Sequence, residues 1–253
     1  MAPFSIELEV NDKLFLRNPQ RSPLGRKILQ NSILLIDEIG FEAFTFRKLA
    51  TRIGSAEASV YRYFENKHLL LIYLSNWYWE WMKFRIDFQT MNLKDPRRKL
   101  RVAISAIVDT VQRNTDVEFI DEDVLHRIVV SEGVKAYHGK AVDQHNREGF
   151  FLSYKSLSLK IADIILEIDA DFPYPRALAS SLLEMASNNI YFADHLPRLT
   201  DVEASEGAVL RQVEDLLNFF AFGLLERGGT AAGNKLNGEV SKKPAVSTNG
   251  TSH

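Results

Sequence analysis

A group of aromatic and basic side chains lies close together at residues 61–67. Tyr61, Arg62 and Tyr63 are consecutive, and Lys67 follows shortly after them. Hydroxyl, guanidinium and ammonium groups are hydrogen-bond donors that suit an anion such as phosphate. A core needs only one side of such a short segment, so the other side presents these groups to a partner. The alternative is an ordinary polar helix face with Tyr63 half-buried.

A second group, of acidic and histidine side chains, could bind a metal ion. Asp123 and His126 have the spacing i, i+3, and Glu122 and His126 have the spacing i, i+4. A di-iron bundle would need a second Glu-x-x-His motif and further inward glutamates, which the sequence lacks. We therefore predict no metal site and no cofactor.

Motifs of the common catalytic sites are missing from the sequence. There is no cysteine, no Gly-x-Ser-x-Gly, no P-loop and no His-Glu-x-x-His. We therefore predict that the protein is not an enzyme, although an enzyme built on a helical bundle stays open as a third alternative.

The charge of the chain is unevenly distributed. The net charge of −2, with 45% hydrophobic and 25% charged residues, is ordinary for a soluble globular protein and names no partner. From Lys13 to Lys67, however, ten basic residues face five acidic ones, which favours an N-terminal module that meets an anion. The longest apolar run, Phe219–Leu225, is too short to span a bilayer. The first twenty residues contain no apolar segment of the kind found in a signal peptide. We expect a cytoplasmic protein without a membrane segment.

The spacing of apolar residues at three and four positions predicts an all-α fold of about nine helices. A first helix carries Ile28 to Ile39 and is closed by Gly40. Thr45 can cap a short second helix that Gly54 ends, and a third helix is expected at 56–64 with Ala58 and Arg62 opposite its core side. The remaining helices are expected at 66–89, 95–113, 121–137, 147–168, 176–193 and 201–226, with a loop at 138–146. The helix at 66–89 is apolar nearly all round, which places it in the middle of a bundle.

Two short helices joined by a turn with glycine are the layout of a helix-turn-helix that reads DNA. Residues 26–74 resemble the tetracycline-repressor (TetR) family of bacterial regulators, in the stretches IDEIGFEAFTFRKLATRIG and SVYRYFENKHLL. The chain departs from the family pattern after the turn glycine. Ser55 is there the expected N-cap of the third helix. Because of Glu57, the resemblance does not predict which operator sequence the protein recognises.

The resemblance implies roles for individual residues in binding double-stranded DNA. Thr45 would hold a phosphate at a helix N-terminus, and Arg62 would reach a guanine edge. Lys67 opposes the macrodipole of its own helix, so a compensating phosphate would explain it. The full set of predicted DNA-binding residues is Thr45, Arg47, Lys48, Ala58, Ser59, Tyr61, Arg62, Tyr63 and Lys67.

We expect a helix-turn-helix domain at 20–68, with the motif itself at about 45–64, a ligand-binding and dimerisation domain at 69–227, and a disordered tail at 228–253. The resemblance implies a homodimer that binds a palindromic operator as a repressor and is released by a small molecule. An architectural or adaptor dimer that binds DNA without a small ligand is the main alternative.

The aromatic residues of the helix at 66–89 are candidates for a ligand pocket. The predicted pocket residues are Trp77, Tyr78, Trp81 and His126, and few charges lie near the aromatic ones, so we expect an apolar or aromatic effector. The same rings could equally be packed core. The last two helices carry apolar stripes that predict the dimer interface. Its predicted residues are Leu182, Met185, Val209, Val213, Leu216, Leu217, Phe220 and Leu224.

Overall fold

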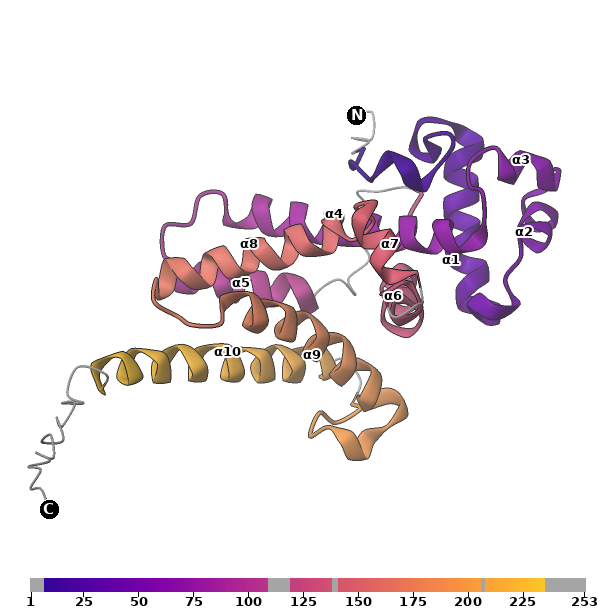
Figure 1. The fold of residues 1–253 in the computed structure, drawn as a ribbon. Coiled ribbons are helices and arrows are strands. Elements are labelled where there is room, and N and C mark those ends of the chain that lie inside the picture. The colour runs from indigo at the N-terminus through magenta and orange to yellow at the C-terminus, as the bar shows by residue number, and fades with distance from the viewer. Residues whose placement is uncertain (1–6, 109–118, 138–140, 206–207, 235–253) are drawn as a thin grey trace, which may run out of the picture.

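The computed structural model describes residues 7–108, 119–137, 141–205 and 208–234, and it is all-α in these ranges, as predicted (Figure 1). No helix in these ranges is long and apolar enough to cross a membrane. The helices and 3-10 turns are η1 (Asp12–Leu14), η2 (Pro19–Arg21), α1 (Pro23–Ala43), α2 (Phe46–Ile53), α3 (Glu57–Tyr61), α4 (Lys67–Thr90), α5 (Pro96–Val108), α6 (Glu122–Tyr137), α7 (Val142–Arg147), α8 (Leu152–Ile168), α9 (Pro175–His195), η4 (Pro197–Leu199) and α10 (Val209–Asn234).

Helices α1, α2 and α3 form a small module at one end of the molecule, and α4 leads from it into the rest (Figure 1). Leu49 of α2 and Val60 of α3 are fully buried in the core of this module. Gly54 ends α2 in the left-handed conformation with φ of 64°, which glycine adopts without steric cost. Gly40 has φ of 74° and bends α1 near its end. Both glycines therefore interrupt the helices where the sequence predicted.

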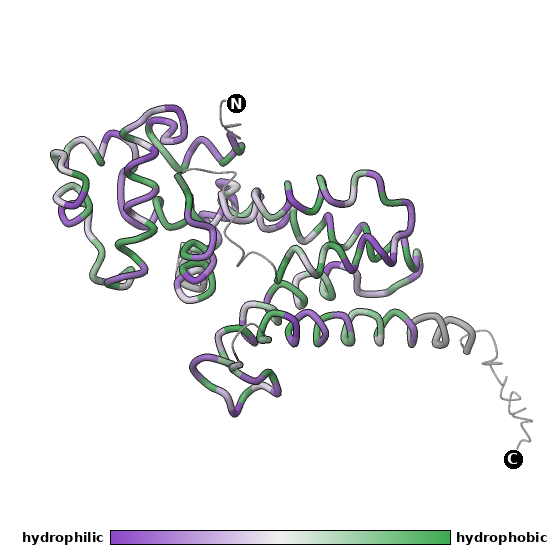
Figure 2. Tube along the Cα trace, turned by 180° about the vertical axis from the view of Figure 1, so that it is seen from behind, coloured by the Kyte–Doolittle hydropathy of each residue, from purple (hydrophilic) through white to green (hydrophobic). Residues whose placement is uncertain are grey.

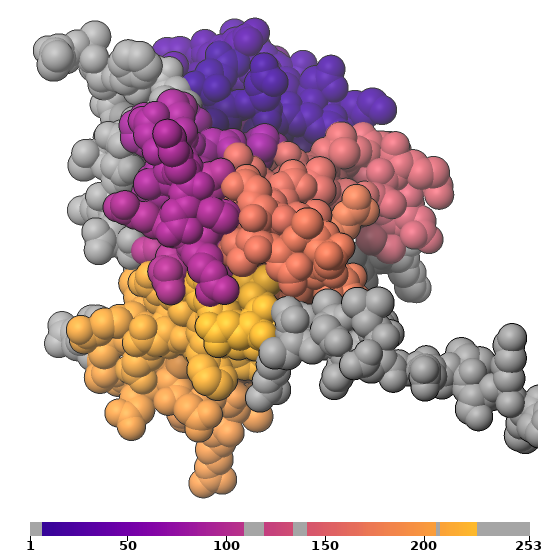
Figure 3. All heavy atoms as spheres, turned by 90° about the vertical axis from the view of Figure 1, so that its left-hand side faces the viewer, coloured from indigo at the N-terminus to yellow at the C-terminus, as the bar shows by residue number. Residues whose placement is uncertain are grey.

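The larger part of the molecule is a bundle around α4, which packs against α5, α6 and α8. Its apolar residues are buried on every side over the first four turns, which agrees with the predicted central position. Figure 3 shows the turn between α4 and α5, in magenta, beside α8, in orange-red, with α10, in yellow, below them. Helix α10 packs on α9 and α5, and its alternation of hydrophilic and hydrophobic residues in Figure 2 is typical of a helix with one buried side.

Several predicted boundaries differ from the structure. Part of the predicted loop at 138–146 belongs to α7, a short polar helix that has no buried residue and therefore no apolar periodicity to reveal it. Helix α3 ends at Tyr61 rather than at residue 64. Helix α10 begins at Val209, after the turn η4, and extends to Asn234, beyond the predicted end at 226. Residues 109–118, where α5 was predicted to end, and residues 235–253 of the predicted tail lie outside the described ranges.

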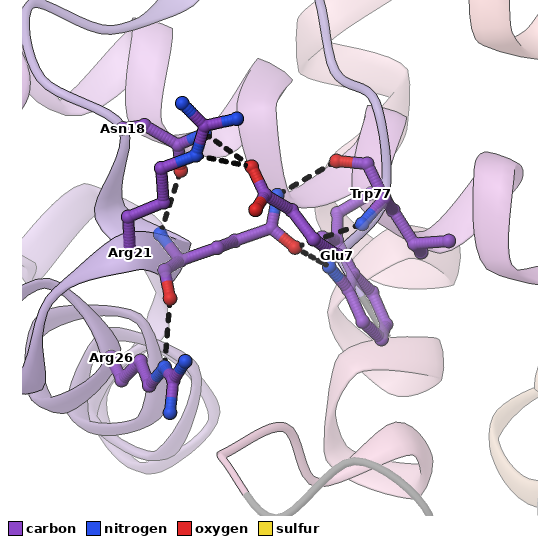
Figure 4. A network of polar contacts seen from close by, with 7 residues as sticks. Glu7, Asn18, Arg21, Arg26 and Trp77 are labelled. Atoms are coloured by element: carbon purple, nitrogen blue, oxygen red, sulfur yellow. Dashed lines mark hydrogen bonds and ion pairs between the residues drawn. The ribbon is translucent and has the colours of Figure 1, made fainter. Parts of the chain in front are cut away.

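An N-terminal arm, residues 7–22, connects the small module to α4 (Figure 4). The buried side chain of Gln20 accepts from the Leu8 backbone N–H and the Trp77 Nε1, at 3.1 and 3.3 Å, and donates to the Leu8 carbonyl at 2.8 Å. Arg26 of α1 donates to the Gln20 carbonyl at 2.7 Å. The arm thus bonds both to α1 and to a tryptophan within the bundle. Its position was not predicted, because η1 and η2 are too short for a periodic pattern.

Candidate nucleic-acid interface and ligand cavity

The helix-turn-helix is held by its own core and caps. Thr45 is the N-cap of α2, and its hydroxyl accepts from the Lys48 backbone N–H at 3.2 Å. The predicted cap at Ser55 is wrong, because Ala56 is the N-cap of α3 and makes no side-chain hydrogen bond. The Ser55 backbone N–H instead donates to the Ala50 carbonyl at 2.9 Å and closes the end of α2.

The outward side of α3 exposes most of the predicted DNA-binding residues. Ala58 and Arg62 are exposed there, and Arg62 lies 3.2 Å from the hydroxyl of the half-buried Ser59. Tyr61 is exposed, and its ring packs edge-on against Phe46 at 5.0 Å between centroids. Arg47 and Lys48 are exposed on the neighbouring α2. The arrangement offers a guanidinium and a hydroxyl from a helix whose direction is fixed by the core.

Tyr63 does not fit its predicted role as a phosphate ligand, because its side chain is only 2% exposed. Its hydroxyl lies 2.7 Å from the hydroxyl of Ser22, the N-cap of α1. The Leu16 backbone N–H donates to the Tyr63 carbonyl at 2.8 Å. The exposed guanidinium of Arg17 lies over the ring, 5.5 Å from its centroid. Arg17 was missed by the sequence reasoning, and only the local excess of basic residues hinted at it.

Lys67 also has partners other than the predicted phosphate. Its Nζ lies 3.0, 3.0 and 3.1 Å from the carbonyl oxygens of Phe41, Glu42 and Phe44, which end α1. It also lies 4.8 Å from the centroid of the Phe41 ring. An ammonium has three donors, so all are used on the negative end of the α1 macrodipole. Lys67 is unfavourable for the dipole of α4, but it neutralises the negative end of α1, which explains a cation at this position.

Some other charges of the module are neutralised by ion pairs. Arg52 of α2 contacts both carboxylate oxygens of Glu38 at 2.5 and 2.8 Å, and this hydrogen bonding lowers the pKa of Glu38. Arg17, Arg47 and Arg62 have no ion pair within the described residues. These three guanidiniums are therefore the ones whose charge is available at the surface.

The four predicted pocket residues are buried together in the bundle. Trp77 and Trp81 stack at 5.9 Å between centroids, and the Tyr78 hydroxyl lies 2.7 Å from His126 Nδ1. This is the packed-core alternative that the sequence left open. No cluster of three His, Asp or Glu side chains suited to a metal is found in the described part of the chain.

A cavity of about 900 Å³ opens beside this core, between α4, α6, α8 and α9. Trp79, rather than Trp77 or Trp81, is the tryptophan that lines it. A helix that is apolar on all sides gives no indication of which side borders a cavity, so the sequence could not select Trp79. Serines and charged residues of α8 and α9 complete the lining.

The burial of His126 predicts a stability that depends on pH. Desolvation, aided by the charge of Arg127, lowers the pKa of His126 from 6.5 to about 4. The unfolded chain takes up a proton near pH 6.5 and the folded protein does not, so the unfolding free energy falls as the pH drops from about 6.5 to 4. The loss reaches about 3 kcal/mol at the acid end. Urea unfolding from pH 7.5 to 4.5, at fixed protein concentration, measures it.

His126→Gln is expected to flatten this pH dependence, because glutamine does not titrate. His195→Gln, which changes an exposed histidine at the end of α9, serves as the control and is expected to retain it. Equal pH dependence in the parent and in His126→Gln would contradict the burial argument.

An apolar surface on α9 and α10 agrees with part of the predicted dimer interface. Phe219, Phe220 and Leu224 are 77%, 43% and 43% exposed. Met185, Val209 and Leu216 are half-buried. Leu182, Val213 and Leu217 are fully buried within the subunit and must be removed from the predicted interface. The correction arises because the α10 stripe has two sides, and the side that carries Val213 and Leu217 packs on α5 and α9.

Known proteins provide an independent comparison. Residues 28–74 match the family model of bacterial regulatory proteins of the tetR family. None of the curated proteins matches the chain.

Solved structures share the fold at low sequence identity. FadR of Bacillus subtilis in complex with stearoyl-CoA is 18% identical, with a TM-score of 0.56 over 76% of this chain and 96% of that one. FadR of Bacillus halodurans is 16% identical, with a TM-score of 0.56 over 78% and 96%. AibR in complex with isovaleryl coenzyme A and operator DNA is 16% identical, with a TM-score of 0.53 over 77% and 97%.

The fold by itself does not decide the activity. A protein described as the superantigen PfiT shares it at 15% identity, with a TM-score of 0.52. The matched segment is more specific, since it contains the whole helix-turn-helix with its capped α2, the left-handed Gly54 and the exposed side of α3. Residues 28–74 are therefore similar to the tetR family of bacterial regulatory proteins, and the rest of the chain shares only the fold of the solved structures.

Proposed function

We propose that the protein is a repressor that binds a palindromic operator as a homodimer and responds to a small molecule. The observation that carries the proposal is the exposed side of α3, with the exposed guanidinium of its C-cap residue Arg62, within the segment that matches the family. Two copies related by a two-fold axis would present two such helices to successive major grooves, so operator symmetry would follow protein symmetry.

The contacts divide into those with phosphates and those with bases. Thr45 at the N-terminus of α2, with Arg47 and Lys48, is suited to the DNA backbone, because helix N-termini and cations favour anions. Tyr61 and Arg17 flank α3 and would add further backbone contacts. The base-reading residues would be Ala58, Ser59 and Arg62, and the guanidinium of Arg62 suits the O6 and N7 acceptors of guanine.

The cavity is the proposed effector site. Proteins of similar fold have been crystallised with acyl thioesters of coenzyme A, one of them also with operator DNA. A cavity of about 900 Å³ is of the size that small-molecule ligands occupy. The cavity supports a ligand-responsive regulator over an architectural dimer without a ligand.

Helix α6 is suited to transmit the binding of a ligand to the DNA-reading module. Val129 of α6 lines the cavity. On the same helix, Arg127 forms an ion pair with Asp37 of α1 at 3.0 Å, and the Glu132 carboxylate accepts from the Phe41 backbone N–H at 3.1 Å. A ligand that moves α6 would therefore move α1, and DNA would weaken ligand binding by the factor with which the ligand weakens DNA binding.

Arg62→Ala tests the DNA-binding role directly. Selection from random-sequence DNA identifies the operator, and fluorescence anisotropy then measures affinity for it and for single-base variants. We expect Arg62→Ala to lose about 1–3 kcal/mol per half-site and to relax the preference at one base pair.

The matched control is Arg52→Ala, which removes one positive charge from the same module where Glu38 already neutralises it. It is expected to bind the operator almost as the parent does. If selection enriches no palindrome, or if Arg62→Ala keeps both affinity and base preference, the proposed function is wrong.

A further inference from the structure

We infer that the cavity takes an amphipathic anion, a molecule with an apolar body and one acidic head group such as a carboxylate or a phosphate. The inference rests on the proposed function of the cavity as the effector site and names the chemical class of the effector. It adds an acidic head group to the mostly apolar or aromatic effector that the sequence favoured.

The inner wall of the cavity is apolar. Trp79, Phe151 and Leu183 are all more than nine-tenths buried and come from α4, α8 and α9. The Trp79 ring packs against Tyr154 at 5.0 Å and against Tyr78 at 4.8 Å between centroids, which fixes its orientation. An alkyl or ring system placed against this wall would gain the hydrophobic contribution of buried apolar area.

The rim of the cavity is charged and carries an excess of cations. Lys155 of α8 and Arg176 of α9 are exposed there, together with one carboxylate, Glu184. Glu184 accepts a hydrogen bond from the Tyr154 hydroxyl at 2.9 Å. Lys155 donates to the neutral amide oxygen of Asn146. The rim therefore has a net charge of about +1 from its side chains at neutral pH.

The two rim cations differ from Lys160 and Lys99 in their partners within the described residues. Lys160, further along α8, pairs with Asp87 at 2.6 Å, and Lys99 of α5 pairs with Glu167. Neither Lys155 nor Arg176 forms an ion pair within the described residues. An anion on the ligand would supply the partner that Lys155 and Arg176 lack within the described residues.

The N-terminus of α9 adds to the positive potential at the rim of the cavity. Arg176 follows Pro175 in the first turn, and the N-cap residue Tyr174 provides no side-chain hydrogen bond to the free N–H groups. A helix N-terminus without a side-chain cap carries a partial positive charge. Ser180, one turn further along α9, also lines the cavity, and its hydroxyl donates to the Arg176 carbonyl at 3.1 Å.

The test compares ligands that share a chain and differ in the head group. The probes are dodecanoate, dodecyl phosphate, dodecanol and dodecyltrimethylammonium, with hexyl and hexadecyl analogues, all below their micelle concentrations. Tryptophan fluorescence, to which Trp79 in the wall contributes, and titration calorimetry measure binding to the full chain. We expect the best carboxylate or phosphate to bind at least tenfold tighter than the alcohol of the same length, and the ammonium probe not to bind.

Variants assign the preference to the rim. Arg176→Gln and Lys155→Gln are each expected to weaken the anion about tenfold while leaving the affinity for dodecanol unchanged. Lys160→Gln, on the same helix but paired with Asp87, is the control and is expected to bind as the parent does. Thermal melts followed by circular dichroism verify that each variant folds.

Equal affinity for alcohol and anion, unchanged anion affinity in both rim variants, or no binding of any anionic probe would overturn the inference. The relative affinities of carboxylate and phosphate identify the head group. Operator binding is measured on the same preparations without a probe. Operator binding with no anion binding would reject the ligand class and leave the proposed DNA-binding function standing. Anion binding that leaves the operator complex intact would reject the effector role and leave the ligand class standing.

Discussion

The proposed homodimer is expected to dissociate into monomers at micromolar concentration when Phe220 is replaced with glutamate. Phe219, Phe220 and Leu224 form an exposed apolar surface on α10, and Tyr191 of α9 is also exposed. In a two-fold interface each substitution occurs twice, so two carboxylates would be buried in an apolar contact. Burying one unpaired charge costs several kcal/mol, so the dimer dissociation constant is expected to rise by at least about a hundredfold.

The loss of the dimer has a consequence for DNA. A palindromic operator is bound through two half-sites, and a monomer makes only half of the contacts. We therefore expect Phe220→Glu to lose most of the operator affinity although its helix-turn-helix is unchanged. Sedimentation velocity and anisotropy on the same samples measure both effects, and circular dichroism verifies the helical content.

Phe88→Glu is the matched control. Phe88 lies near the end of α4, which packs against α5, α6 and α8, and is 68% exposed. It tests whether any exposed aromatic side chain supports association. We expect Phe88→Glu to stay dimeric. A folded, dimeric Phe220→Glu protein would exclude this surface as the interface.

Lys67→Met is expected to lower the unfolding free energy by about 2–3 kcal/mol. Methionine keeps the apolar stem of the side chain but removes the ammonium. The carbonyl groups of Phe41, Glu42 and Phe44 then lose their charged donor, and the end of α1 loses the cation that neutralises it. Urea unfolding followed by tryptophan fluorescence measures the loss.

The same variant separates a structural role from a phosphate contact. If Lys67 only holds α1 against α4, Lys67→Met lowers operator affinity because the DNA-reading module is misplaced. The slope of log affinity against log salt concentration then stays as in the parent. Arg47→Ala, which removes an exposed cation on α2, is expected instead to lower the slope by about one per half-site. A Lys67→Met protein of parental stability with a reduced slope would restore the phosphate contact that the sequence suggested.

The sequence by itself determined the parts of this protein that depend on neighbouring residues. Gly40 and Gly54 interrupt helices because their backbone adopts positive φ. Thr45 caps α2 through a bond to a residue three positions away. The side of α3 that carries Ala58 and Arg62 is exposed because Val60 must enter the core. Helical period, caps and turn glycines operate over one turn, so a single sequence contains them.

Tertiary structure decided the contacts between residues that are distant in the chain. The Tyr63 hydroxyl meets Ser22, and Lys67 meets the end of α1, across 41 and 26 residues. Both side chains were predicted to contact phosphate, and their partners within the protein could not be known before the helices were packed.

The choice between sides of a helix was also a tertiary matter. Helix α4 is apolar nearly all round, so its sequence fits a core at Trp77 and a cavity wall at Trp79 equally well. In α10 one apolar stripe contains both Val213, which is buried within the subunit, and Phe220, which is exposed. Lys155 and Arg176 meet at one rim only because α8 and α9 pack together. Periodicity identifies which residues are apolar, whereas the packing of whole helices determines what each apolar or charged side faces.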